Sequence, residues 1–237
     1  LIAGCGTGQQ LARKTFYKDA TVLAVDLSLS SLALAKRKMQ ELNSKNIEFL
    51  HSDILNLKKI KRKFHIIECI GVLHHLDDPE AGLSILLDLL EPHGYLKLGL
   101  YSELARKHIV KTRESLKKYN FKNNLTDIRN CREMIKSYND NKSFAKLNYN
   151  YDFYTTSSFR DLVLHVQEQR FTIPKISKLI QKYNLQFLGF TDPYLKKDYL
   201  KYFKNDINAL SLQNWNKFEI EHPDIFRGMY QFWVKKN

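Results

Sequence analysis

Apolar runs alternate with helix-like segments over the first 103 residues, and this alternation restricts the fold more than any other feature of the chain. Near-continuous apolar runs are typical of strands buried on both faces, and they occur at 1–4, 21–28, 46–55, 64–73 and 94–103. Segments with helical spacing of apolar residues separate them, at 9–17, 31–43 and 78–92. This order predicts a parallel sheet covered by helices on both sides, and the right-handed crossover rule narrows it to a doubly wound α/β fold.

The pattern changes after residue 103. Residues 104–184 are polar, rich in Lys and Asn and mostly helical in spacing, and 139–156 within them have the character of an irregular loop. Strand-like runs return at 185–190 and 229–234. Because a structureless loop of this length would be unusual, the intervening stretch is best interpreted as an inserted cap or substrate-facing segment.

Charge and cysteine content exclude several classes of protein. The formal net charge is +13, but the excess is mainly Lys spread along the chain, so a biased composition explains it better than a nucleic-acid or anionic-lipid partner. The three cysteines are widely spaced and form no CxxC pair, which favours a reduced, cytoplasmic protein over a disulfide framework or a zinc site.

No apolar stretch approaches the ~20 residues of a membrane span. Residue 1 is a Leu inside a strand-like run, so we expect a longer parent chain.

Three glycines follow the first apolar run, at positions 4, 6 and 8. Open parallel sheets bind ligands at the carboxyl ends of their strands, and glycine lets a ligand approach the backbone with no Cβ in the way. We expect Gly4 to permit a tight exit from the strand, and Gly6 and Gly8 to admit the ligand. A turn without a ligand is the alternative. The dinucleotide fingerprint G-x-G-x-x-G is disfavoured, because its third glycine would fall at Gln9.

This spacing, with an acidic residue 18 positions after Gly8, resembles the class I S-adenosylmethionine-dependent methyltransferases. The resemblance implies that Asp26 accepts hydrogen bonds from both ribose hydroxyls, a role that suits an acceptor-only carboxylate. It also implies that Asp53 lies beside the adenine with Ile54 against the ring, although Asp53 would equally serve as a simple helix cap. The implied cofactor site comprises Gly4, Cys5, Gly6, Gly8, Asp26, Leu27, Asp53, Ile54 and Gly71.

The segment ECIGVLHHLDDP, residues 68–79, looks like the fourth-strand segment of small-molecule methyltransferases related to quinone-biosynthesis enzymes. That likeness implies that Gly71 passes close to the methionine portion of the cofactor. It places His74 and His75 near the transferable methyl, one facing the site and the other packing or capping the next helix; a structural role for both stays open. Histidine has a suitable pKa for a general base. Tyr101, directly after the fifth strand, would line the acceptor pocket or pack.

One further segment, 155–176, resembles a part of methyltransferase domains carried behind tetratricopeptide repeats in bacteria, which implies such repeats upstream. Asp161, His165 and Glu168 are spaced i, i+4 and i+7, so on a helix they share a face beside an apolar one. This polar line is either the solvated side of an amphipathic helix, or part of a lid on which His165 and a flanking arginine recognise an anionic or hydroxylated acceptor. No third ligand follows at suitable spacing, so a metal site is disfavoured.

Together these patterns predict an S-adenosyl-L-methionine-dependent methyltransferase with an unidentified acceptor, which the resemblance suggests is a small molecule. The candidate catalytic residues are His74, His75, Tyr101 and His165. The alternatives are a methyltransferase acting on a protein or nucleic acid, and a module that binds the cofactor without turnover. The implied fold is a Rossmann-like, mostly parallel seven-stranded sheet with a helical insertion between strands five and six. We expect a cofactor-binding half at 1–103, the insertion or cap at 104–184, and the last two strands with their connecting helix at 185–237.

Overall fold

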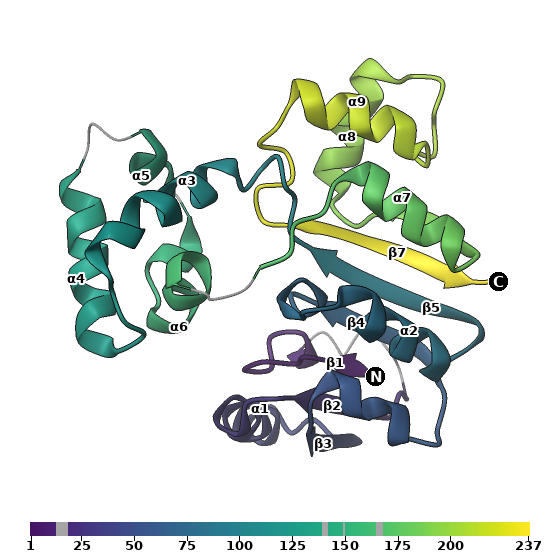
Figure 1. Cartoon of the computed structure of the whole chain (residues 1–237). Helices are drawn as coiled ribbons and strands as arrows, with labels where there is room; N and C mark the ends of the chain where they lie inside the picture. Colours follow the sequence, from purple (N-terminus) through teal and green to yellow (C-terminus); the bar gives the residue numbers. More distant parts are fainter. Residues whose placement is uncertain (13–18, 139–141, 149, 165–167) are drawn as a thin grey trace.

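The core of the molecule is a seven-stranded sheet with the strand order β3-β2-β1-β4-β5-β7-β6 (Figure 1). The computed structural model describes residues 1–12, 19–138, 142–148, 150–164 and 168–237. The strands are β1 (Ile2–Ala3), β2 (Val22–Asp26), β3 (Ile47–His51), β4 (Phe64–Ile70), β5 (Leu90–Leu100), β6 (Leu185–Phe190) and β7 (Tyr230–Lys236). β7 pairs antiparallel with both β5 and β6, and the other neighbouring strands of the described sheet are parallel. The predicted doubly wound, Rossmann-like sheet is therefore confirmed.

Helices cover both faces of the sheet because alternate residues of its inner strands point to opposite sides. The covering helices are α1 (Leu29–Glu41), α2 (Pro79–Leu89), α7 (Ile173–Lys182), α8 (Pro193–Tyr202) and α9 (Leu212–Glu221). In β2, Val22 and Ala24 pack in one apolar cluster with Leu32 and Ala35 of α1. Leu23 and Val25 belong to a second, larger cluster, which also holds side chains of α2, α7 and α9. None of the helices in the described part of the chain is long and apolar enough to cross a bilayer.

The segment between β5 and α7 forms a helical insertion that stands to one side of the sheet (Figure 1). Its elements are α3 (Lys107–Leu116), η4 (Lys117–Tyr119), α4 (Leu125–Ser137), α5 (Lys142–Leu147), η5 (Tyr151–Phe153), α6 (Thr156–Phe159) and the π-helical turn η6 (Arg160–Leu164). A separate apolar cluster, with Ile128, Phe144 and Phe153 fully or almost fully buried, holds these helices together. The insertion thus has a hydrophobic core of its own.

Two expectations for this region need correction. The stretch 139–156 was expected to be an irregular loop, yet it contains α5, which forms because Phe144 and Leu147 are buried in the insertion core. The interval 104–184 was expected to be one helical insertion or substrate cap, but α7 at its end lies on the sheet, where Ile176 and Ile180 join the main cluster. The apolar face of α7 packs on the sheet, whereas the apolar side chains of the preceding helices pack in the core of the insertion.

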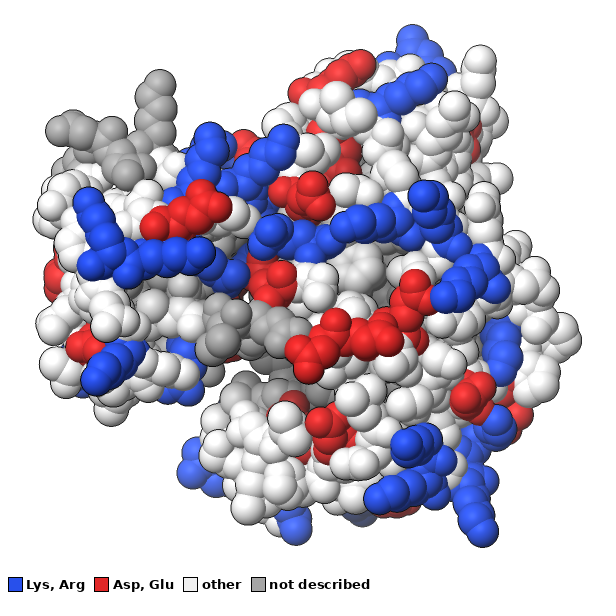
Figure 2. Space-filling model, viewed as in Figure 1, with Lys and Arg blue, Asp and Glu red and all other residues white. Residues whose placement is uncertain are grey.

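Charged side chains of both signs share one face of the molecule. On the face drawn in Figure 2, Lys and Arg alternate with Asp and Glu over both the sheet and the insertion. This mixture agrees with the interpretation of the net charge of +13 as a general excess of Lys.

A buried carboxylate fastens α9 to the sheet. Glu219 accepts hydrogen bonds from the Tyr230 hydroxyl, at 2.6 Å to Oε1 and 2.7 Å to Oε2, and from Ser102 Oγ at 2.6 Å. All three residues are buried. Burial raises the pKa of Glu219, against the opposing effect of the two hydroxyl donors. A polar group in such surroundings depends on its partners.

We therefore expect Tyr230→Phe to destabilise the fold by about 1–3 kcal/mol, because it removes a donor from a buried acceptor. Chemical denaturation measures the change in the free energy of unfolding. Tyr194→Phe is the matched control, since Tyr194 is 78% exposed and the same change there should be neutral. Equal stability of the two variants would contradict the role given to this contact.

Candidate functional site

A cavity of about 300 Å³ opens at the carboxyl ends of β1, β2, β3 and β4. The strand order reverses between β1 and β4, so the cavity lies at the position where open α/β sheets bind their ligands. Residues that the sequence analysis selected line much of it: Gly4, Asp26, Leu27, Asp53, Ile54, Gly71 and His75. Cys5, Gly6, Gly8, His74 and Tyr101 lie outside this lining. His165 lies outside the described residues.

The three glycines of the turn have different surroundings. A Cβ on Gly4 would lie 2.0 Å from Val72 Cγ2, and the φ of +82° also favours glycine, so no side chain fits there. Gly6 has a φ of +51° and no atom within 4 Å of a Cβ, so open space faces it. A Cβ on Gly8 would lie 3.1 Å from the Cβ of Ala35 in α1. The lack of a Cβ and the φ of +90° let the turn pack against α1 at Gly8, and the role of Gly8 in admitting a ligand stays a prediction.

Asp26 ties this turn to the end of β2. Its Oδ2 accepts from the Gly6 N–H at 2.7 Å, and its Oδ1 accepts from the Ser28 N–H at 2.8 Å. The Gly4 and Cys5 N–H groups both donate to the Val25 carbonyl, at 2.8 and 2.9 Å. Each carboxylate oxygen keeps a second lone pair, so Asp26 can accept further hydrogen bonds from a ligand in the cavity.

The thiol of Cys5 points away from the cavity. It is 3% exposed and packs in the apolar cluster between β1, β2 and α1. Burial raises its pKa to about 12, so the thiol stays protonated and unreactive. Cys5 therefore contributes its backbone to the turn and its side chain to the core.

The segment after β3 forms a second wall of the cavity. Asp53 begins a short 3₁₀ helix, η2 (Ile54–Lys59), and its Oδ1 accepts from the Leu55 N–H at 2.8 Å. The helix-cap interpretation of Asp53 is thus confirmed. Because Asp53 also lines the cavity, the cap holds its carboxyl group at the rim. Ile54 is 7% exposed and presents an apolar surface beside it.

The structure distinguishes the two histidines that follow β4, both in the short helix η3 (Leu73–His75). His75 lines the cavity. His74 is fully buried and stacks on Tyr101, with the ring centroids 3.7 Å apart. The Arg106 guanidinium lies 3.6 Å from the centroid of the Tyr101 ring. Burial raises the pKa of the Tyr101 phenol against the opposing charge of Arg106, so the phenol remains protonated at neutral pH.

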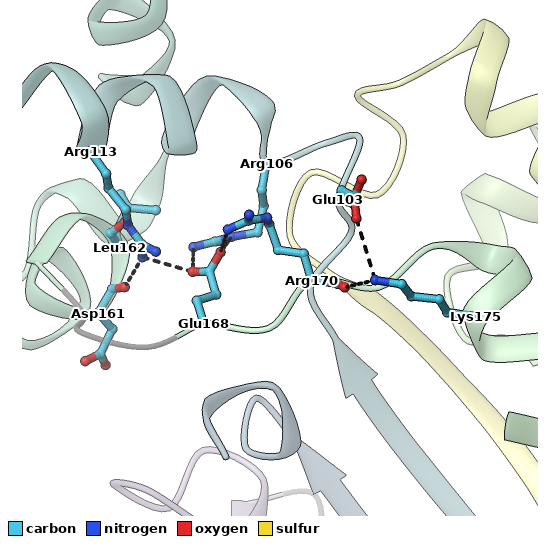
Figure 3. A network of polar contacts seen from close by, with 8 residues as sticks. All are labelled: Glu103, Arg106, Arg113, Asp161, Leu162, Glu168, Arg170 and Lys175. Carbon is cyan, nitrogen blue, oxygen red and sulfur yellow. Dashed lines mark hydrogen bonds and ion pairs between the residues drawn. The ribbon is translucent and has the colours of Figure 1, made fainter. Parts of the chain in front are cut away.

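Arg106 leads from this stack to a buried ionic network (Figure 3). Its Nε and Nη2 donate to Oε1 and Oε2 of Glu168, at 2.9 and 2.7 Å. Arg113 Nη2 lies 2.9 Å from Oε2, and Arg170 Nη1 lies 3.7 Å from Oε1. Burial raises the pKa of Glu168, but Arg106 and the other two arginines outweigh it and hold the pKa below its ordinary value. Glu168 is therefore ionised at neutral pH.

This position of Glu168 corrects the prediction of a polar helix face through Asp161, His165 and Glu168. The described helical structure ends in the π-helical turn at Leu164, and the Glu168 side chain is only 1% exposed. Three guanidiniums surround the carboxylate, so Glu168 does not lie on a solvated helix face. The lid on which His165 would act stays a prediction, because His165 lies outside the described residues. The contact of Arg106 with Glu168 could not be predicted, because no local pattern links two residues that are 62 positions apart.

The residues next to Glu168 cross the carboxyl ends of β4 and β5; we call residues 168–171 the strap. The Gln169 N–H donates to the His74 carbonyl at 2.7 Å, and the Phe171 N–H donates to the Tyr101 carbonyl at 2.8 Å. The Glu103 N–H donates back to the Phe171 carbonyl at 2.8 Å. The strap thereby joins the insertion to the main chain of His74 and Tyr101.

Metal ligands are not gathered anywhere in the described residues: no three His, Cys, Asp or Glu side chains there are arranged to hold an ion.

Comparison with known proteins places the chain in a family. A family model described as a methyltransferase domain matches residues 2–182. The chain belongs to this family of methyltransferase domains. An uncharacterised protein of Synechococcus sp. is 27% identical to it, over 96% of this chain and 59% of the relative. A ubiquinone biosynthesis O-methyltransferase of Coxiella burnetii is 33% identical over 40% of each chain. The chain thus spans less than two thirds of the length of these relatives.

Solved structures share the fold. PKMT2 from Rickettsia typhi, determined in complex with AdoHcy, superimposes with a TM-score of 0.73 at 19% identity, over 100% of this chain and 48% of that one. The [4+2]-cyclase SpnF superimposes with a TM-score of 0.53 at 12% identity, over 99% of this chain and 73% of that one. At these identities the likeness establishes the architecture.

We expect the contact between Arg106 and Glu168 to stabilise the junction between the insertion and the sheet. Arg106→Met leaves a buried carboxylate without its bidentate partner and is expected to cost about 3–5 kcal/mol of unfolding free energy. Chemical denaturation gives the value.

Arg62→Met is the matched control. Arg62 also makes two hydrogen bonds to one carboxylate, at 3.2 Å each to Glu48, but this pair is exposed. Its loss should cost no more than about 1 kcal/mol. If both variants lost the same stability, the buried network would not hold the joint.

Proposed function

We propose that this methyltransferase domain transfers a methyl group from S-adenosyl-L-methionine to a small-molecule acceptor. The observation that carries the proposal is the position of Asp26: its carboxylate lines a cavity at the strand-order reversal, beside a glycine turn that it holds in place. A carboxylate at the end of the strand next to β1 is suited to a ribose, because it offers acceptors to two neighbouring hydroxyls.

The residues around the cavity fit this cofactor. Gly6 leaves the backbone open to close approach, and Gly71, with a φ of +79°, turns the chain after β4 without a side chain. Asp53 and Ile54 offer an acceptor and an apolar surface for an adenine. The AdoHcy complex of the Rickettsia typhi protein, whose fold this chain shares, supports the same choice. Cys5 and Gly8 would act by shaping the turn.

The chemistry asks little of the protein beyond position. When bound, the cofactor supplies a methyl group on a sulfonium, which is already activated for displacement. The chain then orients the acceptor in line and excludes water, effects worth up to about 7–11 kcal/mol in favourable cases. His75 lines the cavity and is our candidate for removing a proton from the acceptor. Tyr101 and His74 form a stacked pair that holds the neighbouring wall. His165 remains a candidate on the insertion.

The small-molecule acceptor rests on sequence likeness. The Coxiella burnetii relative is a ubiquinone biosynthesis O-methyltransferase, and its 33% identity covers 40% of this chain. A protein or nucleic-acid acceptor is the alternative. Because SpnF has the same architecture and is a cyclase, fold alone does not determine the reaction, and product formation must be measured. A cytoplasmic location and upstream tetratricopeptide repeats remain predictions.

Calorimetry with AdoHcy tests the cofactor site. Asp26→Ala removes the acceptor of two hydroxyl hydrogen bonds, so the affinity should fall at least ~30-fold, since one hydrogen bond to a charged group contributes about 1.5–3 kcal/mol. Glu41→Ala, on the exposed end of α1, should bind like the wild type. Unchanged affinity of the Asp26 variant would reject the ribose assignment.

Because Asp26 also holds the turn, a second variant separates the two roles. Gly6→Val adds a side chain into open space, so the fold should tolerate it apart from the cost of about 1–3 kcal/mol for a β-branched residue in this backbone conformation. Binding of AdoHcy should nevertheless be lost, because the new side chain occupies the space facing the turn. A folded Gly6→Val protein that binds AdoHcy normally would mean that the turn has only a structural role.

Turnover is measured as formation of S-adenosylhomocysteine with candidate acceptors. His75→Ala should lower kcat by about 10²–10⁴ if the acceptor must lose a proton, with the AdoHcy affinity little changed. His65→Ala, at the opposite end of β4, is the control. Tight AdoHcy binding without product from any acceptor would instead favour the non-catalytic module.

A further inference from the structure

The insertion contains a hollow of about 510 Å³ that lies apart from the lining of the cofactor cavity. It is bounded by α3, η4, η6 and the strap, and we call it the insertion pocket. Among the residues that the structure describes, three cationic side chains line it: Arg113, Lys117 and Arg170. Apolar side chains, among them Phe121 and Val163, supply much of the remaining surface. Such a combination suits a molecule with one apolar part and one anionic group.

Positive charge exceeds negative charge around the pocket. Two carboxylates, Glu114 and Glu168, also line it. Glu168, however, is already engaged by a fourth cation, since Arg106 binds both of its oxygens from the inner side. The charge of Glu168 is thus shared among three guanidiniums, which leaves a net excess of cations facing the hollow.

The two arginines of the pocket differ in how firmly they are held. Arg113 donates to the Leu162 carbonyl at 3.0 Å and to the Asp161 carbonyl at 2.8 Å, besides its contact with Glu168. Burial lowers the pKa of Arg113, and the charge of Arg106 lowers it further against the opposing effect of Glu168. An additional anion in the pocket would relieve this repulsion.

Arg170 is the more available of the two. Its contact with Glu168 is long, at 3.7 Å, and its side chain is 32% exposed. Figure 3 shows its guanidinium converging with that of Arg106 on the same carboxylate, while the Asp161 carboxylate points away from Arg113. A guanidinium carries five N–H donors in a planar fork, and one long ion pair uses few of them. Carboxylate and phosphate are the groups that match this fork.

We propose that the insertion pocket binds the carboxylate or phosphate group of an amphipathic small molecule, with Arg170 and Lys117 as its charge partners. The apolar part of that molecule packs on Phe121 and Val163. The proposal does not depend on methyl transfer, because the pocket and the cofactor cavity are lined by different residues.

Calorimetry on the 237-residue chain tests the proposal with three probes: phenyl phosphate, hexanoate and the neutral benzyl alcohol. At least one of the two anions should bind at low salt, more weakly as ionic strength rises, and benzyl alcohol should bind at least ~10-fold more weakly. Arg170→Gln and Lys117→Gln should each reduce the anion's affinity at least ~10-fold, through loss of a charge-assisted hydrogen bond. Binding of both anions supports carboxylate and phosphate as ligands, and binding of one selects it.

Matched controls remove the same charges elsewhere. The control variants are Lys118→Gln and Arg129→Gln. Lys118 lies in the same 3₁₀ turn as Lys117 but is not part of the lining, and Arg129 lies on the exposed side of α4. Both should bind the anion like the wild type. Arg170→Gln removes only the long contact to Glu168, so its unfolding midpoint and its AdoHcy affinity should be retained. The proposal is overturned if neither anion binds, if benzyl alcohol binds as well, or if the pocket variants behave like the controls.

Discussion

One buried carboxylate, Glu168, decides how the two parts of the molecule are joined. Its oxygens take a bidentate contact from Arg106 and further contacts from Arg113 and Arg170, and both Arg106 and Glu168 are almost completely inaccessible. Charges in that position are stable only while paired. The insertion has its own apolar core, and this ionic contact helps to set its place beside the sheet, together with the main-chain hydrogen bonds of the strap.

The same contact places the insertion next to the site. Arg106 stacks on Tyr101, which stacks on His74, and His75 lines the cavity beside them. The strap then adds main-chain hydrogen bonds to His74 and Tyr101. Side chains of the insertion therefore contact residues that neighbour the cavity, whereas the lining of the cavity comes from the ends of β1 to β4 and the segments that follow them.

The parts of the structure that were predictable from sequence are those encoded locally. Short stretches of sequence were enough to predict the glycine turn before Gln9, the acidic residue at the end of β2 and the apolar strands. The strands form the expected sheet. Pairings between distant residues were not predictable. Nothing in the spacing around Glu168 reveals its arginine partners, and its polar neighbours suggested an exposed helix face. Gly8 likewise is a glycine for two reasons, its φ of +90° and the nearness of Ala35 in α1, and the second comes from a distant part of the chain.

The strap has a consequence for movement of the insertion. An insertion that swung outward as a rigid flap would break the main-chain bonds from Gln169 to His74 and between Phe171 and residues 101–103. Any such movement that separated Glu168 from Arg106 would also break a buried bidentate ion pair. Outward movement of the whole insertion as a rigid body therefore carries a high free-energy cost, and the strap keeps the insertion beside the carboxyl ends of β4 and β5.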